Sequence, residues 1–240
     1  MEKVTPHTGV AVITGGGSGI GLALAGVFSH AGSSVVIGGR DPGRLQAAAG
    51  ELKKSGWTVA AIQCDVRDPS SVTGFLAQVG KRHPQINVLI NNAGVAHALG
   101  PVEKLSLETW RQVIDTNLTG VFLVTRAALP MMPAGSTIVN NLSIAATQPF
   151  AGMSAYNASK FGAMGFTQAL REELRQKGIR VVALLPGATD TDIWGQFWAN
   201  APREKMVSAE TVAEAVLHAV SAPPNASIDE IRVLPASGVL

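Results

Sequence analysis

The only tyrosine of the chain, Tyr156, stands four residues before Lys160 in the stretch SAYNASKFGAM at residues 154–164. Residues i and i+4 lie on one face of an α-helix, so a helix here would bring a phenol and an ammonium together. A free tyrosine has a pKa of about 10, and a nearby positive charge lowers that pKa by stabilising the phenolate. The pair is therefore a candidate proton donor and acceptor, although a buried tyrosine beside a surface lysine would show the same spacing.

A glycine-rich segment, TGGGSGIG at residues 14–21, is the second candidate site, between the apolar run VAVIT and the helix-like stretch LALAGVF. A strand, a glycine turn and a helix N-terminus place backbone N–H groups where a pyrophosphate can bind. The glycine spacing departs from the common GxGxxG pattern, and a flexible turn would not explain why the segment joins these two elements. We predict dinucleotide contacts at Gly15, Ser18, Gly19, Ile20 and Gly21.

The residue that senses the adenosine ribose is expected about twenty residues after the glycine loop, at the end of the second strand. The chain reads IGGRDP there, which puts Arg40 at this position. An arginine attracts the 2′-phosphate of NADP, whereas an acid would bind the free 2′-hydroxyl of NAD. Asp41 precedes Pro42 and is typical of a helix N-cap. These residues favour NADP(H), and a solvated Arg40 without a role would leave NAD open.

The elements that must position these residues are Val- and Ile-rich runs separated by helix-length segments. This alternation is typical of parallel strands with helical crossovers. We predict one α/β domain over residues 1–240, with a doubly wound, mostly parallel seven-stranded sheet of the Rossmann type and helices on both faces. The predicted strands are residues 10–14, 34–38, 58–63, 87–91, 136–140, 179–185 and 229–234.

Helix boundaries are also visible in the sequence. Asp41 and Asp68 each precede a proline, a pattern that predicts an N-cap followed by the first helical turn. Gly178 predicts a helix stop, so the helix with the tyrosine and lysine is expected to run from about Ser154 to Lys177.

Composition limits the kind of partner. The chain has 19 Lys and Arg against 17 Asp and Glu, which leaves no charge surplus to bind nucleic acid or an anionic membrane surface. The single Cys64 cannot form an intramolecular disulfide or a multi-cysteine metal site, which fits a reducing compartment, and it is expected in the core. No apolar stretch is long enough for a signal peptide or a membrane span. We expect a cytoplasmic protein that binds a small molecule, with neither nucleic acid nor membrane as a partner.

Together, these features resemble the short-chain dehydrogenase/reductase family over nearly the whole chain. The matching residues are TGGGSGIG, Asp65, NNAG at 91–94, Asn117, Ser143, Tyr156 and Lys160. The resemblance implies that Tyr156 is the general acid for reduction and the general base for oxidation, with no metal, and that Lys160 lowers its pKa and holds the nicotinamide ribose. It implies that Ser143 hydrogen-bonds the substrate oxygen and that the Asn117 carbonyl anchors a water linking Lys160 to solvent. It also implies a homodimer or homotetramer.

The resemblance implies further cofactor contacts and a substrate lid at about residues 188–205. Trp194, Phe197 and Trp198 recur at helical spacings in this segment and predict an apolar face on a short helix, either over the substrate or packed on the core. Trp194, Ser143 and Tyr156 are the predicted substrate contacts. His97 is expected on the surface of a loop, with one polar contact to the substrate as the alternative. Besides Tyr156 and Lys160, the implied cofactor contacts are Asp65, Val66, Asn91, Ala93, Gly94, Pro186, Gly187, Thr189 and Thr191.

The predicted function is hydride transfer between NADP(H) and a carbonyl compound or secondary alcohol. One alternative is an NAD-linked alcohol or hydroxysteroid-type dehydrogenase, in which Arg40 has no role. Another is a non-catalytic redox sensor that binds NADP. A methyltransferase would not need Ser143, Tyr156 and Lys160 in this register. The C-terminal IDEIRVLPASGVL lacks the closing glycine pair of many 3-oxoacyl carrier-protein reductases and looks more like the branch that acts on 3-hydroxy acids and related small alcohols.

Overall fold

The computed structural model describes residues 9–198 and 200–238. Within them, seven parallel strands form one sheet in the order β3-β2-β1-β4-β5-β6-β7. The predicted seven-stranded sheet is confirmed, and each predicted strand agrees with an observed one to within one residue at either end. The strands are β1 (Val10–Thr14), β2 (Ser34–Gly39), β3 (Val59–Gln63), β4 (Val88–Asn91), β5 (Thr137–Asn141), β6 (Arg180–Pro186) and β7 (Glu230–Val233).

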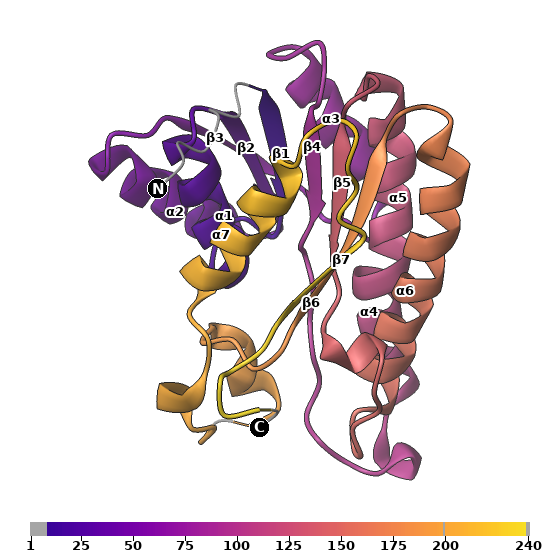
Figure 1. The fold of residues 1–240 in the computed structure, drawn as a ribbon. Coiled ribbons are helices and arrows are strands. Elements are labelled where there is room, and N and C mark those ends of the chain that lie inside the picture. Colours follow the sequence, from indigo (N-terminus) through magenta and orange to yellow (C-terminus); the bar gives the residue numbers. More distant parts are fainter. Residues whose placement is uncertain (1–8, 199, 239–240) are drawn as a thin grey trace.

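Helices cover both faces of the sheet (Figure 1). Because successive side chains of a strand point to opposite faces, Ile13 packs with α1, α2 and α7, whereas Val12 packs with α3, α5 and α6. Strands buried on both sides explain the near-continuous apolar runs in the sequence. The helices are α1 (Gly19–His30), α2 (Pro42–Lys54), α3 (Pro69–Gly80), α4 (Leu107–Ile114), α5 (Gly120–Ala128), α6 (Ser154–Arg175) and α7 (Ala209–Val220).

The predicted helix boundaries hold where side chains cap the backbone. The Asp41 carboxylate accepts hydrogen bonds from the N–H groups of Gly43 and Arg44, at 2.8 and 3.1 Å. Asp68 accepts one from the N–H of Ser70 at 2.9 Å. Helix α6 begins at Ser154 as predicted and ends at Arg175, two residues before Lys177.

Within residues 9–198 and 200–238, five short helical turns and one π-helical segment connect the main elements. They are η1 (Val102–Lys104), the π-helical η2 (Asp115–Thr119), η3 (Leu129–Met131), η4 (Ile144–Ala146), η5 (Asp192–Gln196) and η6 (Arg203–Lys205). Cys64 lies in the core, where burial raises the pKa of its thiol to about 12. In the part of the chain that the structure describes, no helix is both long and apolar enough to cross a membrane.

The order in which the chain adds strands to the sheet reverses at the junction of β1 and β4. Strands β1, β2 and β3 follow one another toward one edge, and β4 then pairs with β1 on its other side and starts the path toward β7. In open α/β sheets, ligands bind beyond the carboxyl ends of the strands at such a reversal. A ligand site is therefore expected at the loops after β1, β4 and β5.

Candidate active site

A cavity of about 690 Å³ opens beyond the carboxyl ends of the central strands. It is lined by the glycine loop, by the segments that follow β4, β5 and β6, and by the first turns of α6. The predicted residues that line it are Gly15, Ser18, Gly19, Ile20, Arg40, Ala93, Gly94, Ser143, Tyr156, Lys160, Pro186, Gly187, Thr189, Thr191 and Trp194. Gly21, Asp65, Val66, Asn91 and Asn117 lie outside its lining.

The glycine loop forms a close cradle. Gly15 and Gly19 have φ angles of +66° and +50°, and a Cβ at Gly15 would lie 2.8 Å from the Cα of Ala93. A Cβ at Gly21 would lie 2.2 Å from the carbonyl oxygen of Gly15, so Gly21 is needed for the approach of α1 rather than for the cavity wall. Ser18 makes no side-chain cap to the first turn of α1, which also holds no acid. The free N–H groups and the helix dipole therefore fit a pyrophosphate.

Two asparagines fix the loop to the ends of the strands. Asn92 donates to the carbonyl oxygens of Thr14 and Gly15, at 3.0 and 3.1 Å. Its own side-chain oxygen accepts a 2.8 Å hydrogen bond from Asn141. Sequence reasoning named neither asparagine as a site residue. Asn92 belongs to NNAG, so the motif held a signal for it, whereas the role of Asn141 depends on its position at the end of β5.

Asn91 lies outside the cavity lining, and its predicted cofactor contact stays a prediction. Its side chain is buried and donates to Thr125 at 2.9 Å and to Asn140 at 2.8 Å, and Asn140 in turn donates to Thr167. The side chains of Asn91 and Asn140 together join β4, β5, α5 and α6. The next residue, Asn92, lines the cavity instead.

Asp65 and Val66 also lie outside the main cavity. Arg67 holds the carboxylate of Asp65 with a 2.6 Å contact, and this hydrogen bond is the main cause that lowers the pKa of Asp65. Val66 and Asn91 line a separate small pocket. The structure therefore does not place the predicted adenine contacts in the cavity wall.

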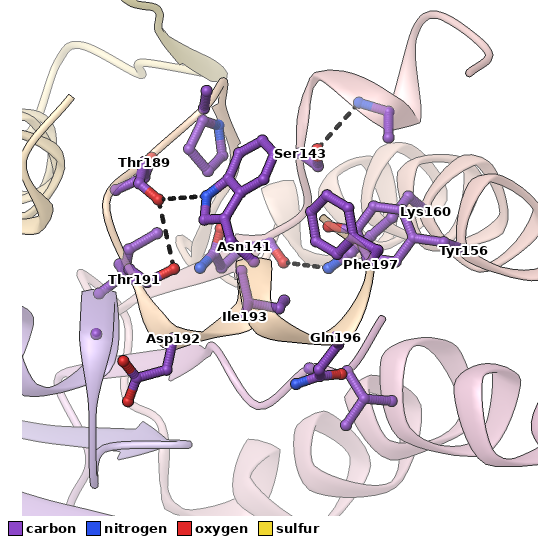
Figure 2. Close-up of a pocket in the computed structure, with 18 of the residues that line it drawn as sticks. Asn141, Ser143, Tyr156, Lys160, Thr189, Thr191, Asp192, Ile193, Gln196 and Phe197 are labelled. Atoms are coloured by element: carbon purple, nitrogen blue, oxygen red, sulfur yellow. Dashed lines mark hydrogen bonds between the residues drawn. The ribbon is translucent and has the colours of Figure 1, made fainter. Parts of the chain in front are cut away.

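Tyr156 and Lys160 lie on one face of α6, as their spacing predicts (Figure 2). The Lys160 ammonium is 5.5 Å from the centroid of the tyrosine ring and donates to the carbonyl oxygen of Asn141 at 3.0 Å. Lys160 is only 6% exposed, and burial lowers its pKa from 10.5 to about 8. A charge that is costly to bury and is already hydrogen-bonded suits a functional group rather than a surface lysine.

The expected fall in the tyrosine pKa is not observed. Burial raises the pKa of Tyr156, while a hydrogen bond with Ser143 works in the opposite direction. The physical reason is that the phenol is desolvated while the ammonium is bound to Asn141. Ser143, two residues beyond β5, thus brings a second hydroxyl to the tyrosine, and its oxygen also accepts from the N–H of Ala145 at 3.1 Å.

The Asn117 side chain joins the segment after β4 to α6 by hydrogen bonds. It lies in η2 and is 1% exposed. Its side chain accepts from the N–H of Val95 and donates to the Val95 carbonyl, both at 2.9 Å, and it donates to the Ser159 hydroxyl at 3.0 Å. These bonds tie the segment after β4 to α6. The side chain is committed to this tie, and the predicted role of the backbone carbonyl stays a prediction.

Two arginines line the end of the cavity that lies beside β2 and α2, away from Tyr156. Arg40 follows β2, and Arg44 lies in the first turns of α2. The nearest acid to Arg44 is Asp41, at 3.9 Å. Sequence reasoning missed Arg44, although its place three residues after the N-cap Asp41 puts it next to the loop that carries Arg40.

The segment after β6 forms another wall of the cavity. The predicted aromatic face is present, with the Trp194 ring centroid 4.7 Å from that of Phe197 and 6.1 Å from that of Trp198, although η5 is a 3₁₀ turn. The Trp194 indole donates to the carbonyl oxygen of Thr189 at 2.8 Å. The side chain of Gln196 accepts a 2.9 Å hydrogen bond from the N–H of Ala96, which ties this segment to the loop after β4.

The expectation for His97 is wrong. Its side chain is 6% exposed, and Nδ1 lies 2.8 Å from the carbonyl oxygen of Ala98. Two hydrogen bonds hold the loop that carries it against other segments, from the N–H of Gly100 to the carbonyl oxygen of Gly152 and from the N–H of Ala96 to the side chain of Gln196. Neither long-range contact is visible from the sequence.

Fold and site together define an oxidoreductase of the Rossmann type. The chain belongs to the short-chain dehydrogenase family, whose family model matches residues 9–202. The curated relative sulfoacetaldehyde reductase 2 of Chromohalobacter salexigens is 33% identical over 237 residues, which cover 94% of each chain.

Solved structures of this family superpose closely. A short-chain dehydrogenase from Burkholderia cenocepacia in complex with NADP has a TM-score of 0.87 at 30% identity, covering 96% of this chain and 98% of that one. A 3-ketoacyl-(acyl-carrier-protein) reductase from Brucella melitensis in complex with NADH has a TM-score of 0.84 at 29% identity, covering 93% and 96%. Both nicotinamide dinucleotides are thus bound by structural neighbours of this chain.

Proposed function

We propose that this oxidoreductase transfers a hydride between NADP(H) and a carbonyl compound or secondary alcohol, with Tyr156 as the general acid and base. The observation that carries the proposal is the convergence of the Ser143 and Tyr156 hydroxyls beside Lys160, in the cavity that also holds the glycine loop. Two hydroxyl groups at one point suit a single carbonyl oxygen, one as hydrogen-bond donor and the other as proton donor.

In this mechanism the side chains handle the proton. Bound NADP(H) supplies the hydride for reduction and accepts it for oxidation. Tyr156 donates its proton to the substrate oxygen during reduction, and Ser143 holds that oxygen. The Lys160 ammonium stabilises the phenolate that remains, and in oxidation Tyr156 takes the proton from the alcohol. Because its pKa is about 8, Lys160 gradually loses this charge above that pH.

The preference for NADP rests on the cations at the far end of the cavity. Arg40 and Arg44 both line it, and an arginine pair suits a 2′-phosphate better than a free ribose hydroxyl. With an NADH complex among the structural neighbours, an NAD-linked dehydrogenase is the alternative. Titration of the protein with both cofactors separates the two.

The segment at about residues 188–205 is proposed as the substrate lid. It contributes Trp194 and its aromatic neighbours to the cavity wall, and Gln196 ties it across the cavity to Ala96. A lid of this kind excludes water from the reacting groups.

A homodimer or homotetramer is proposed as the assembly. Large apolar side chains are exposed on α4, α5 and α6, which are neighbours on one side of the sheet (Figure 1). They are Leu107, Trp110, Phe122 and Phe161. Apolar side chains that gather on one surface indicate a protein contact, and the mass in solution tests it.

The central test is Tyr156→Phe, which removes the transferable proton and little of the binding surface. We expect turnover of carbonyl compounds to fall by about 10²- to 10⁴-fold, the usual contribution of a general acid. Absorbance of the reduced nicotinamide measures turnover, and fluorescence titration should show NADP affinity within a few fold of the wild type. Retained turnover would exclude Tyr156 as the acid. A wild-type protein that binds NADP but turns over no carbonyl compound would instead be a redox sensor.

A further inference from the structure

The charges of the cavity are unevenly placed. Among the described lining residues, the cations are Arg40, Arg44 and Lys160. Arg40 follows β2 and Ser143 follows β5, and the order β2-β1-β4-β5 separates these strands by three spacings, or about 14 Å at 4.8 Å each. Arg40 and Arg44 therefore lie far from the reacting hydroxyls.

Lys160, the remaining cation, is not available to a substrate anion at the end of the cavity that holds Ser143 and Tyr156. Lys160 is buried and donates to Asn141, and the proposed chemistry uses its charge to stabilise the tyrosine phenolate. Arg203, near the end of the lid, is paired with Asp190 at 2.6 Å. Asp192, in the lid itself, adds a negative charge to the cavity wall. An anionic group placed next to the reacting carbonyl would meet no free cation among the described residues.

Apolar side chains surround the same end. Phe150 and Met153 line it from the loop that precedes α6, and Trp194 and Phe197 line it from the lid. Figure 2 shows Ile193 and Phe197 on the turn that runs past Lys160 and Tyr156. Burying apolar substrate surface against such a wall is favourable, whereas burying an unpaired anion is costly.

At the rim of the cavity, near the end that holds Ser143 and Tyr156, apolar side chains are exposed to solvent. Leu99 is 51% exposed and Trp198 is 41% exposed, although both line the cavity. Leu99 lies beside the loop of residues 150–153, because Gly100 bonds to Gly152 at 3.1 Å. A bulky apolar substituent on the substrate would cover this surface.

We propose that the substrate is a neutral carbonyl compound or secondary alcohol with a bulky apolar substituent, aryl or branched alkyl. Short substrates that carry a carboxylate or sulfonate beside the carbonyl are disfavoured. The inference rests on the proposed function, because it assumes that the reacting carbonyl lies at Ser143 and Tyr156. It separates this chain from its relative named for sulfoacetaldehyde, whose substrate is a small sulfonate.

The test compares methyl ketones of matched length that end in phenyl, carboxylate or sulfonate. Binding is measured by quenching of tryptophan fluorescence in the NADP-loaded protein, and turnover is measured with NADPH. We expect the phenyl ketone to bind at least about tenfold more tightly than either anion, because only the anions enter without a partner. Equal or tighter binding of an anionic ketone overturns the substrate class. Selective binding of the phenyl ketone with no turnover of any ketone supports the class and refutes hydride transfer.

A matched pair of variants tests the charge argument. Leu99→Arg supplies a guanidinium at the exposed rim, and Leu99→Gln supplies a neutral polar side chain at the same position. We expect Leu99→Arg to raise kcat/KM for the carboxylate ketone by about tenfold, as one charge-assisted hydrogen bond would, with the gain weakened by salt. Leu99→Gln should bring no such gain, and both variants should lower kcat/KM for the phenyl ketone. If the two variants treat the carboxylate ketone alike, the charge argument is wrong.

Discussion

The cavity has two walls that are held in different ways. The wall at the strand ends is fixed by short hydrogen bonds among neighbouring elements, through Asn92, Asn141 and Lys160. The wall formed by the proposed lid is joined to the loop after β4 by the hydrogen bond that Gln196 accepts from the N–H of Ala96. Groups that must be placed to a fraction of an ångström belong on the first wall, whereas the second can change shape with the substrate.

This difference predicts that substitutions on the strand-end wall affect chemistry and cofactor binding, whereas those on the lid affect substrate affinity. Lys160→Met is expected to have the largest effect, because it removes both the charge beside the tyrosine and the donor to Asn141. Turnover should fall by about a hundredfold or more, and NADP affinity should fall as well. Single-turnover kinetics and cofactor titration check the two effects separately. A loss of only one of them would show that the lysine has a single role.

The same variant has a stability signature that depends on pH. Burial lowers the pKa of Lys160 from 10.5 to about 8, so below pH 8 folding retains the full cost of the buried charge. As the pH rises from 8 toward 10.5, the folded state releases a proton that the unfolded state keeps, and the cost declines. Relative to Lys160→Met, the wild type should therefore gain roughly 1 kcal/mol of unfolding free energy between about pH 7 and pH 9. Parallel pH profiles of urea unfolding would contradict this.

Arg40→Ala tests the preference for NADP over NAD at the end of the cavity that Arg40 and Arg44 line. It should weaken NADP by about 10- to 100-fold, since a charge-assisted contact with phosphate is worth roughly 1.5 to 3 kcal/mol, and it should leave NAD nearly unchanged. Arg44→Ala is the matched variant, because Arg44 lines the same end of the cavity. Isothermal titration with both cofactors measures the effect. Equal weakening of NADP and NAD by Arg40→Ala would remove the basis for a preference.

The sequence predicted the strand-end wall better than the lid. Strand limits follow from local apolar runs, and the capping aspartates act within three residues, so both are visible in the sequence. Asn141 was missed and the burial of His97 was misjudged because their surroundings come from other elements, α6 for Asn141 and the lid and the loop before α6 for His97. The raised pKa of Tyr156 was also missed, since helical spacing reports which side chains are near and not how far they are desolvated.

The smallest expected effect is on the lid, where Trp194→Ala removes the ring that contacts both Phe197 and Trp198. We expect KM for the best carbonyl substrate to rise by about three- to tenfold, as expected for lost apolar contact, while NADP affinity and Tm change little. Trp194→Phe is the control, because it keeps an aromatic ring, though a smaller one, and loses the indole donor to Thr189. If the phenylalanine variant behaves like the wild type, the ring is what the substrate uses. If it behaves like the alanine variant, the hydrogen bond that shapes the lid matters more. A collapse of Tm with an unchanged KM would place Trp194 in the core, and the contrast between a rigid wall and an adaptable lid would then be wrong.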